Sequence, residues 1–289
     1  MTTPTDVTLA PREQDLMGLP IRRLLPQRAQ RHCGPFVFLD HMGPHRLAPG
    51  QGLDVPPHPH IGLSTLTWLF SGEIQHRDSL GTMQRIVPGA VNWMTAGKGI
   101  VHSERSPDAT RAAGSEIEGL QFWVAQPEAT EQGEPGFQHC EASELPKGKI
   151  AGANWTLVAG QWQGEQSPVK VDSALSLVVF ESQSAGELHL PQPSTTWEWG
   201  FYGLEGELAW DGNSLEPRHL RIRNQGGRLT WQAGARWVLI GGEPLGKRLM
   251  DWNFVATRAD LIDAARLRWK ERGFPPVPGD DGYVPYPGS

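Results

Sequence analysis

Short apolar segments alternate with turn residues along most of this 289-residue chain. Between residues 63 and 74, apolar side chains alternate loosely with small polar ones, which is typical of a strand covered on both faces. The 34 glycines and 25 prolines are spread along the chain, so tight turns are expected at short intervals. The pattern predicts an all-β protein with little regular helix.

The second half of the chain repeats this strand-and-turn pattern. Residues 203–207 (GLEGE) echo residues 69–73 (LFSGE), which indicates a second copy of the same barrel. Between the halves, residues 127–146 are acidic and contain few apolar side chains, as in a linker or surface loop. We therefore expect domains at 1–127 and 148–289, joined by residues 128–147.

A helical period occurs near the C-terminus. Thr257-Arg258-Ala259-Asp260 resembles a capping box, the apolar residues that follow lie broadly on one face, and Gly273 is a stop signal. These signals predict one amphipathic helix of about four turns. Residues 274–287 are rich in proline and aromatic side chains, and we expect them to wrap across the protein, with a disordered tail as the alternative.

Charge and hydropathy exclude some classes of partner. The net charge is −6 and no basic run exceeds Arg22-Arg23, so direct nucleic-acid binding is not expected. No window is long and apolar enough to span a bilayer, and the polar residues 1–15 are expected to fray. A cytoplasmic location is the default, with the nucleus as an alternative in a eukaryotic cell. Cys33 and Cys140 are expected to be free thiols.

Two triplets carry the candidate chemistry: His58-Pro59-His60 and His102-Ser103-Glu104. Side chains two apart on a strand point to the same face, so each triplet presents two metal-capable groups together. If the two strands face each other, three imidazole nitrogens and one carboxylate meet at one point. Such a set suits a divalent first-row metal and leaves coordination positions open. The alternative is that two histidines in a proline-rich loop are simply solvated.

Beyond the triplets, several blocks of sequence resemble one family. Gly52, the HxH motif at His58 and the sequence from Gly97 to His102 look like the two metal motifs of the cupin superfamily. The surrounding sequence resembles the pirin family in five blocks: residues 38–43 (FLDHMG), 57–62 (PHPHIG), 76–81 (HRDSLG), 93–104 (WMTAGKGIVHSE) and 119–124 (GLQFWV). These blocks cover most of residues 18–127. One departure is Ser64, which replaces the usual cupin glutamate four residues after the second histidine; the resemblance assigns the carboxylate ligand to Glu104 instead.

The resemblance implies two tandem cupin barrels, that is, double-stranded β-helix or jelly-roll folds, followed by the short C-terminal helix. It implies one divalent metal ion in the first barrel, held by His58, His60, His102 and Glu104. Fe(II) is the expected metal, with Ni, Mn, Cu and Zn as alternatives. The second half has only two histidines, His189 and His219, and they are unpaired, so we expect a metal-free second barrel.

Pirins are similar to flavonol-cleaving dioxygenases of the cupin superfamily. This similarity implies a quercetinase-type oxidoreductase that cleaves a small aromatic chelating substrate with O2, with Glu104 as the catalytic base. The family also implies an alternative, a non-enzymatic metal- or redox-sensing regulator. Such a regulator would bind a protein partner as a transcriptional cofactor or as a modulator of a metabolic enzyme.

Five further residues are candidates for the wall of a substrate pocket. The segment around His41 borders the metal pocket in the resemblance, although a surface or capping imidazole is the alternative. His76 competes most strongly for a ligand role, but it lies outside the paired triplets, so we expect it in the pocket wall at most. The remaining candidates are Ser64, Trp68 and Trp93.

Overall fold

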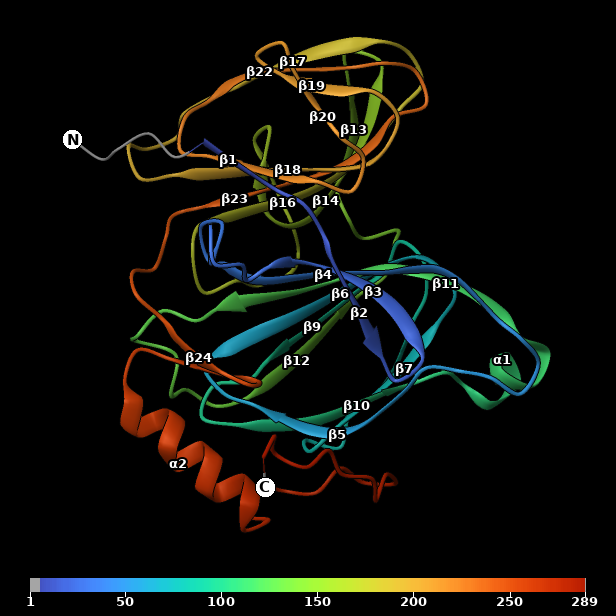
Figure 1. The fold of residues 1–289 in the computed structure, drawn as a ribbon, viewed down its shortest axis with the longest axis vertical. Helices are drawn as coiled ribbons and strands as arrows, with labels where there is room; N and C mark the ends of the chain where they lie inside the picture. The colour runs from blue at the N-terminus through green and yellow to red at the C-terminus, as the bar shows by residue number, and fades with distance from the viewer. Residues whose placement is uncertain (1–5, 289) are drawn as a thin grey trace. The chain divides into compact units, whose positions relative to one another are not determined.

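The computed structural model describes residues 6–288, whose regular structure consists mainly of antiparallel β-sheets (Figure 1). The chain divides into two compact units. The first unit comprises residues 6–12, 23–39 and 143–244, and the second comprises residues 13–22, 40–142 and 245–288. Each unit is built around one large sheet and one four-stranded sheet. The expected all-β fold with two cupin barrels and a short C-terminal helix is confirmed.

The second unit contains both histidine triplets. Its large sheet has the strand order β12-β9-β6-β11-β4-β3-β2, and its smaller sheet has the order β5-β10-β7-β8. The large sheet consists of β2 (Arg12–Leu16), β3 (Leu19–Leu25), β4 (Phe36–Leu47), β6 (Leu63–Ser71), β9 (Val91–Thr95), β11 (Ser115–Ala125) and β12 (Gly136–Cys140). The smaller sheet consists of β5 (Asp54–His60), β7 (Ile74–Asp78), β8 (Met83–Ile86) and β10 (Ile100–Arg105).

In the first unit, the large sheet has the order β1-β21-β18-β23-β16-β14-β13, with β15 beside β14, and the smaller sheet has the order β17-β22-β19-β20. The bounds are β1 (Asp6–Leu9), β13 (Lys147–Ile150), β14 (Ala153–Trp162), β15 (Glu165–Gln166), β16 (Leu175–Ser182), β17 (Gly186–Leu190), β18 (Glu198–Glu205), β19 (Leu208–Trp210), β20 (Asn213–Leu215), β21 (Leu220–Arg223), β22 (Gly227–Trp231) and β23 (Arg236–Gly242).

Aromatic side chains fill the core of the first unit. Trp237 of β23 is completely buried and stacks on Phe180 with ring centroids 4.8 Å apart. The ring of Trp231 on β22 also lies 4.8 Å from that of Trp237. Trp199 and Trp210 belong to the same cluster. Large rings therefore occupy the interior of this barrel, where a cluster of polar ligands would otherwise need space.

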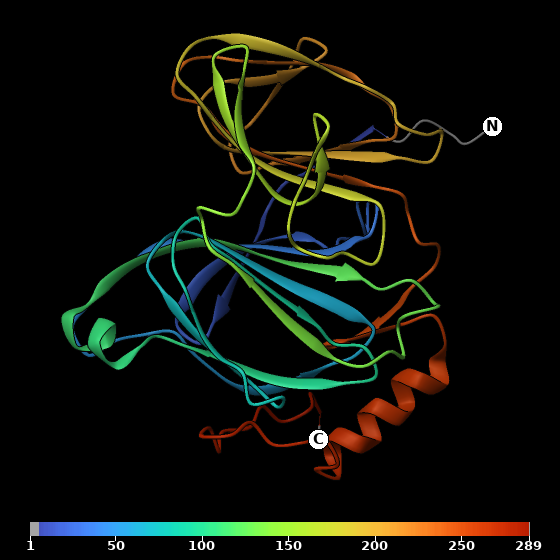
Figure 2. The ribbon, with the colours of Figure 1, turned by 180° about the vertical axis from the view of Figure 1, so that it is seen from behind.

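The two helices and a last strand pair belong to the second unit. Helix α1 (Asp108–Ala113) is one short turn, β24 (Leu249–Asp251) pairs with β25 (Phe254–Ala256), and α2 (Ala259–Lys270) follows. Figures 1 and 2 both show α2 beside β24 and the tail passing along β5 and β10. Val101 of β10 packs in one cluster with Trp269 and Phe274, so α2 and the tail cover the outer face of β10.

Hydrogen bonds and an ion pair attach this tail to the same two strands. The backbone N–H of Val284 donates to the Pro57 carbonyl at 3.0 Å, and the Arg105 guanidinium holds both carboxylate oxygens of Asp280 at 2.7 and 2.9 Å. Tyr283 stacks on Trp269 with centroids 4.5 Å apart. The tail wraps across the second unit as expected, and the alternative of a disordered tail does not apply to residues 274–288.

The domain boundaries expected from the sequence differ from the compact units, which also divide residues 6–39 between them. Residues 128–142 join the second unit rather than form a linker, because β12 pairs with β9 along the edge of the large sheet. Residues 245–288 also join the second unit, because β25, α2 and the tail bury their apolar side chains against β5 and β10. Composition could not show that the C-terminal residues pack against the barrel that contains the histidine triplets.

Two local expectations also differ from the structure. Residues 6–9 form β1 and pair with β21, so this part of the N-terminus does not fray; residues 1–5 lie outside the described part of the chain. Helix α2 begins after Arg258 with no side-chain cap. The N-cap residue is Arg258 rather than Thr257, and the Thr257 hydroxyl and backbone N–H both donate to the buried Glu131 instead.

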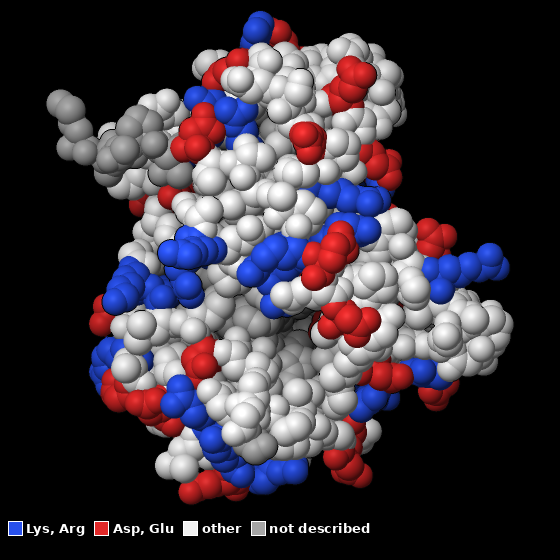
Figure 3. All heavy atoms as spheres, viewed as in Figure 1, with Lys and Arg blue, Asp and Glu red and all other residues white. Residues whose placement is uncertain are grey.

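Within residues 6–288, neither helix is long and apolar enough to cross a membrane. On the face seen in Figure 3, lysine and arginine side chains are intermixed with aspartate and glutamate.

The Arg105–Asp280 pair makes a testable contribution to stability. Its hydrogen bonds to Arg105 lower the pKa of Asp280 from 3.8 to about 2. A depressed folded-state pKa stabilises the protein above about pH 4 and loses that effect as pH falls toward 2. We expect Asp280→Asn to lower the free energy of unfolding by about 1 kcal/mol at pH 7, since partial exposure of Arg105 screens the pair. Denaturant unfolding should show the difference between the proteins shrinking from pH 4 to pH 2; a pH-independent difference would contradict the assignment.

Candidate metal centre

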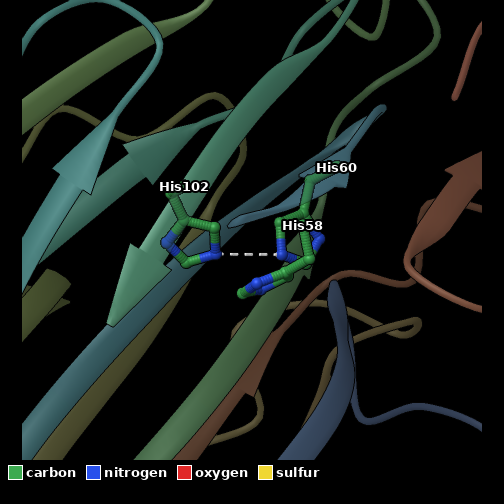
Figure 4. Close-up of side chains that lie close together, drawn as sticks. All are labelled: His58, His60 and His102. Carbon is green, nitrogen blue, oxygen red and sulfur yellow. Dashed lines mark hydrogen bonds between the residues drawn. The ribbon is translucent and has the colours of Figure 1, made fainter. Parts of the chain in front are cut away.

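The pairing of β5 with β10 brings three histidines together. In this antiparallel pair His102 lies opposite His58, and Ile100 lies opposite His60. One ring nitrogen from each of His58, His60 and His102 lies within 4.8 Å of the others. Figure 4 shows the three rings turned toward one another, with the Nε2 atoms of His60 and His102 joined at 3.1 Å. All three side chains are buried.

Local turn geometry sets this arrangement. Gly97 precedes β10 with φ of +51°, and a Cβ atom there would lie 2.2 Å from the Gly133 carbonyl oxygen. Gly62 follows β5 with φ of +64° and donates its backbone N–H to the Gly97 carbonyl at 2.9 Å. Only glycine combines this conformation with such close backbone approach. The two turns therefore lock the end of β5 to the start of β10, where the histidines lie.

Hydrogen bonds to backbone carbonyls orient two of the rings. His58 Nδ1 lies 2.9 Å from the Pro56 carbonyl, and His60 Nδ1 lies 3.2 Å from the Asn253 carbonyl. A carbonyl oxygen only accepts, so Nδ1 carries the proton in both neutral rings and Nε2 keeps its lone pair. Two nitrogens bound at right angles to one metal, each at about 2.1 Å, would be about 3.0 Å apart. The 3.1 Å separation of the His60 and His102 Nε2 atoms fits this geometry.

Burial keeps these imidazoles uncharged. Loss of water lowers the pKa of His58 to about 4, and it lowers the pKa values of His60 and His102 well below the ordinary 6.5. Neutral imidazole is the form that binds metals. The site therefore presents metal-binding nitrogens at neutral pH without first releasing a proton.

Glu104 lies on β10 with His102, but outside the group of three. A change of register separates the two residues, because His102 lies opposite His58 whereas Glu104 lies opposite Val55. Such a bulge re-aims the side chains that follow it. The Glu104 carboxylate accepts a hydrogen bond from the Thr67 hydroxyl at 3.3 Å. Burial raises the pKa of Glu104, opposed by nearby His76 and by Thr67. Its role as the fourth ligand remains a prediction.

Comparisons with known proteins identify the family to which the chain belongs. Residues 18–124 match the Pirin family and residues 177–275 match the Pirin C-terminal cupin domain. The chain belongs to the pirin family. A pirin-like protein of Caulobacter vibrioides is 42% identical over 92% of this chain and 93% of its own length. A Pseudomonas aeruginosa protein with the provisional name quercetin 2,3-dioxygenase is 40% identical over 88% of this chain and 80% of its own.

The fold comparison agrees with the sequence comparison. The crystal structure of quercetin 2,3-dioxygenase from Acinetobacter baumannii superimposes with a TM-score of 0.90 at 34% identity. It covers 98% of this chain and 95% of its own. The expected pirin identity is therefore confirmed.

The pocket residues expected in this pirin do not all lie on the side of the metal centre. Thr67, which contacts Glu104, defines the face toward the metal centre. Strand register places Ser64, Trp68 and Trp93 on the opposite face, because side chains alternate along each strand. His41 is buried on β4, with Nε2 3.3 Å from a Glu118 carboxylate oxygen.

His76 and two further residues lie on the metal side. His76 Nδ1 is 3.4 Å from His102 Nδ1. Trp123 of β11 meets His60 edge-on with centroids 5.1 Å apart, and Phe137 of β12 stacks on His76 at 4.6 Å. Trp123 and Phe137 were missed in the sequence. Trp123 shares a face with Thr65 and Thr67 once β11 is paired with β6, and only that pairing identifies it.

Removal of one histidine tests the centre. His58→Ala should weaken binding of nickel(II) or iron(II) severely, because two remaining imidazoles cannot enclose the ion. The barrel should stay folded, since its core consists of apolar side chains away from the rings. His189→Ala, an exposed histidine on β17, is the control and should bind like wild type. Titration calorimetry of metal-free protein measures both; equal affinities in the two variants would contradict the assignment.

Proposed function

We propose that this pirin is a metal-dependent dioxygenase of the quercetinase type, acting with O2 on planar aromatic substrates that chelate a metal through adjacent oxygens. The observation that carries the proposal is that one ring nitrogen from each of three buried histidines lies within 4.8 Å of the others inside one barrel. The relatives named for quercetin 2,3-dioxygenase activity support the reaction class. Iron(II) is the metal we favour, with nickel, manganese, copper and zinc as alternatives.

The donor set suits a cation that must keep positions open for substrate. Three imidazoles and one carboxylate leave coordination positions free, unlike the closed, cysteine-rich shells of structural zinc. A divalent metal bound there would act as a Lewis acid toward the chelating oxygens of the substrate. His58, His60 and His102 would hold it, with Glu104 as the fourth ligand.

Glu104 would also serve as the catalytic base. Burial raises its pKa, and a base is most effective when its pKa approaches the working pH. Its carboxylate would accept the proton of the substrate hydroxyl that coordinates the metal. The Thr67 hydroxyl lies 3.3 Å from a Glu104 carboxylate oxygen and 2.9 Å from the Gln121 side-chain oxygen, so it lies between the two side chains and can donate to the carboxylate.

Substrate access follows from the exposure of these residues. The three histidines are buried, whereas Glu104 and Gln121 keep part of their surface open to solvent. A substrate would therefore approach along Glu104 and Gln121, with the Trp123 ring beside it. This path differs from the wall of Trp68 and Trp93 expected from the sequence.

A second candidate is a non-enzymatic regulator that senses metal or redox state through a protein partner. The near-complete burial of His60 and His102 favours it, because an enclosed metal can change charge without meeting a substrate. The same four residues would serve both functions. Turnover of a small molecule separates them.

The proposal is tested with iron-loaded protein, quercetin and air, following oxygen uptake and ring cleavage. Wild type should turn over. Glu104→Gln should lower kcat by about 10²- to 10⁴-fold, the usual contribution of a general base, while retaining part of its metal. Glu118→Gln alters a carboxylate on β11 that contacts His41, and it should stay near wild type. Unchanged turnover in Glu104→Gln would exclude the base, and fully metal-loaded wild type without oxygen uptake would favour the regulator.

A further inference from the structure

A chain of buried polar groups leads away from the third histidine. His102 Nδ1 lies 3.4 Å from His76 Nδ1, and His76 Nε2 lies 3.0 Å from an Asp78 carboxylate oxygen. The other Asp78 oxygen accepts the backbone N–H groups of Leu80 and Thr82 at 2.9 and 3.0 Å. The side chains of His102, His76 and Asp78 are each at least 95% buried. Strand β7 supplies the chain, because it pairs with β10 and places Asp78 opposite His102.

The proton positions along this chain follow from its carboxylate end. Asp78 acts as a hydrogen-bond acceptor at both oxygens, because one accepts the Leu80 and Thr82 backbone N–H groups and the other faces His76 Nε2 at 3.0 Å. A carboxylate only accepts, so His76 places a proton on Nε2. In the neutral His76 ring, Nδ1 then carries a lone pair directed at His102. Two facing lone pairs would repel each other, so His102 carries its own proton on Nδ1.

We propose that Asp78 and His76 are positioning residues of the metal centre, which hold His102 in the tautomer whose Nε2 binds the ion. The inference rests on the metal centre proposed above. His58 and His60 are oriented by backbone carbonyls, which no side-chain substitution removes. His102 is oriented by side chains, so its donor atom depends on the identity of two residues that do not touch the metal.

Packing holds the central ring of the chain in place. His76 stacks on Phe137 with centroids 4.6 Å and ring planes 27° apart. A phenylalanine at position 76 can keep this stack while removing both ring nitrogens. Asparagine at position 78 keeps an oxygen for the Leu80 and Thr82 N–H groups, but it presents an N–H₂ group to His76. That amide favours the opposite tautomer of His76, which would place a proton on Nδ1 facing His102.

The test is the affinity of metal-free protein for nickel(II), measured by chelator competition. His76→Phe and Asp78→Asn should each weaken binding about 10- to 100-fold, the usual effect of removing a partner that orients a metal-binding histidine. Because Asp78 acts only through His76, the double variant should bind no more weakly than His76→Phe alone. Glu131→Gln is the matched control, a buried carboxylate of the same unit hydrogen-bonded to Thr257, and it should bind like wild type. Circular dichroism verifies folding of each variant.

A spectroscopic measurement decides the tautomers directly and does not depend on any variant. Long-range ¹H–¹⁵N NMR of zinc-loaded wild type should show His102 protonated at Nδ1 and His76 protonated at Nε2 alone. His76 protonated at Nδ1, or wild-type nickel affinity in both single variants, would overturn the chain while leaving the metal centre intact. Wild-type protein that binds no nickel would instead overturn the metal centre itself, and this proposal with it.

Discussion

The antiparallel pairing of β5 with β10 is the constraint on which the site depends. It brings the rings of His58, His60 and His102 to one side of the sheet, with His58 directly opposite His102. On the other side of the same strands, Val101 packs beneath α2 and the tail. A shift of one residue would exchange these two sets of side chains, burying imidazoles among hydrocarbon and exposing valine inside the barrel. Metal binding and packing therefore require the same register.

Burying three imidazoles is acceptable because their Nδ1 atoms have partners. An unpaired polar group buried in protein costs roughly 1–3 kcal/mol, so three unmet nitrogens would consume much of the stability of a small domain. Here Pro56, Asn253 and His76 each face one Nδ1 atom. What remains unsatisfied is the set of Nε2 lone pairs, and these point at one another. A cation bound between these atoms would give each Nε2 lone pair a partner.

Much of this could be predicted from the sequence, since the alternation of strands identifies His58, His60 and His102 without any pairing information. The chain through His76 could not, because it requires the register of β7 against β10. The same applies to Trp123, whose face is known only after β11 pairs with β6, and to the bulge that separates Glu104 from His102. Boundaries were the weakest expectation: residues 245–288 resemble the end of a C-terminal domain, yet their apolar side chains pack in the second unit, against β5 and β10. Local composition does not show which distant strands a C-terminal segment packs against.

The centre is most directly tested by diffraction from crystals of the nickel- or iron-loaded protein, with data collected at the absorption edge of the metal. The account predicts one anomalous peak about 2.1 Å from the Nε2 atoms of His58, His60 and His102. A peak bonded to Nδ1 of any of these rings, or no peak among them at full metal loading, would contradict it.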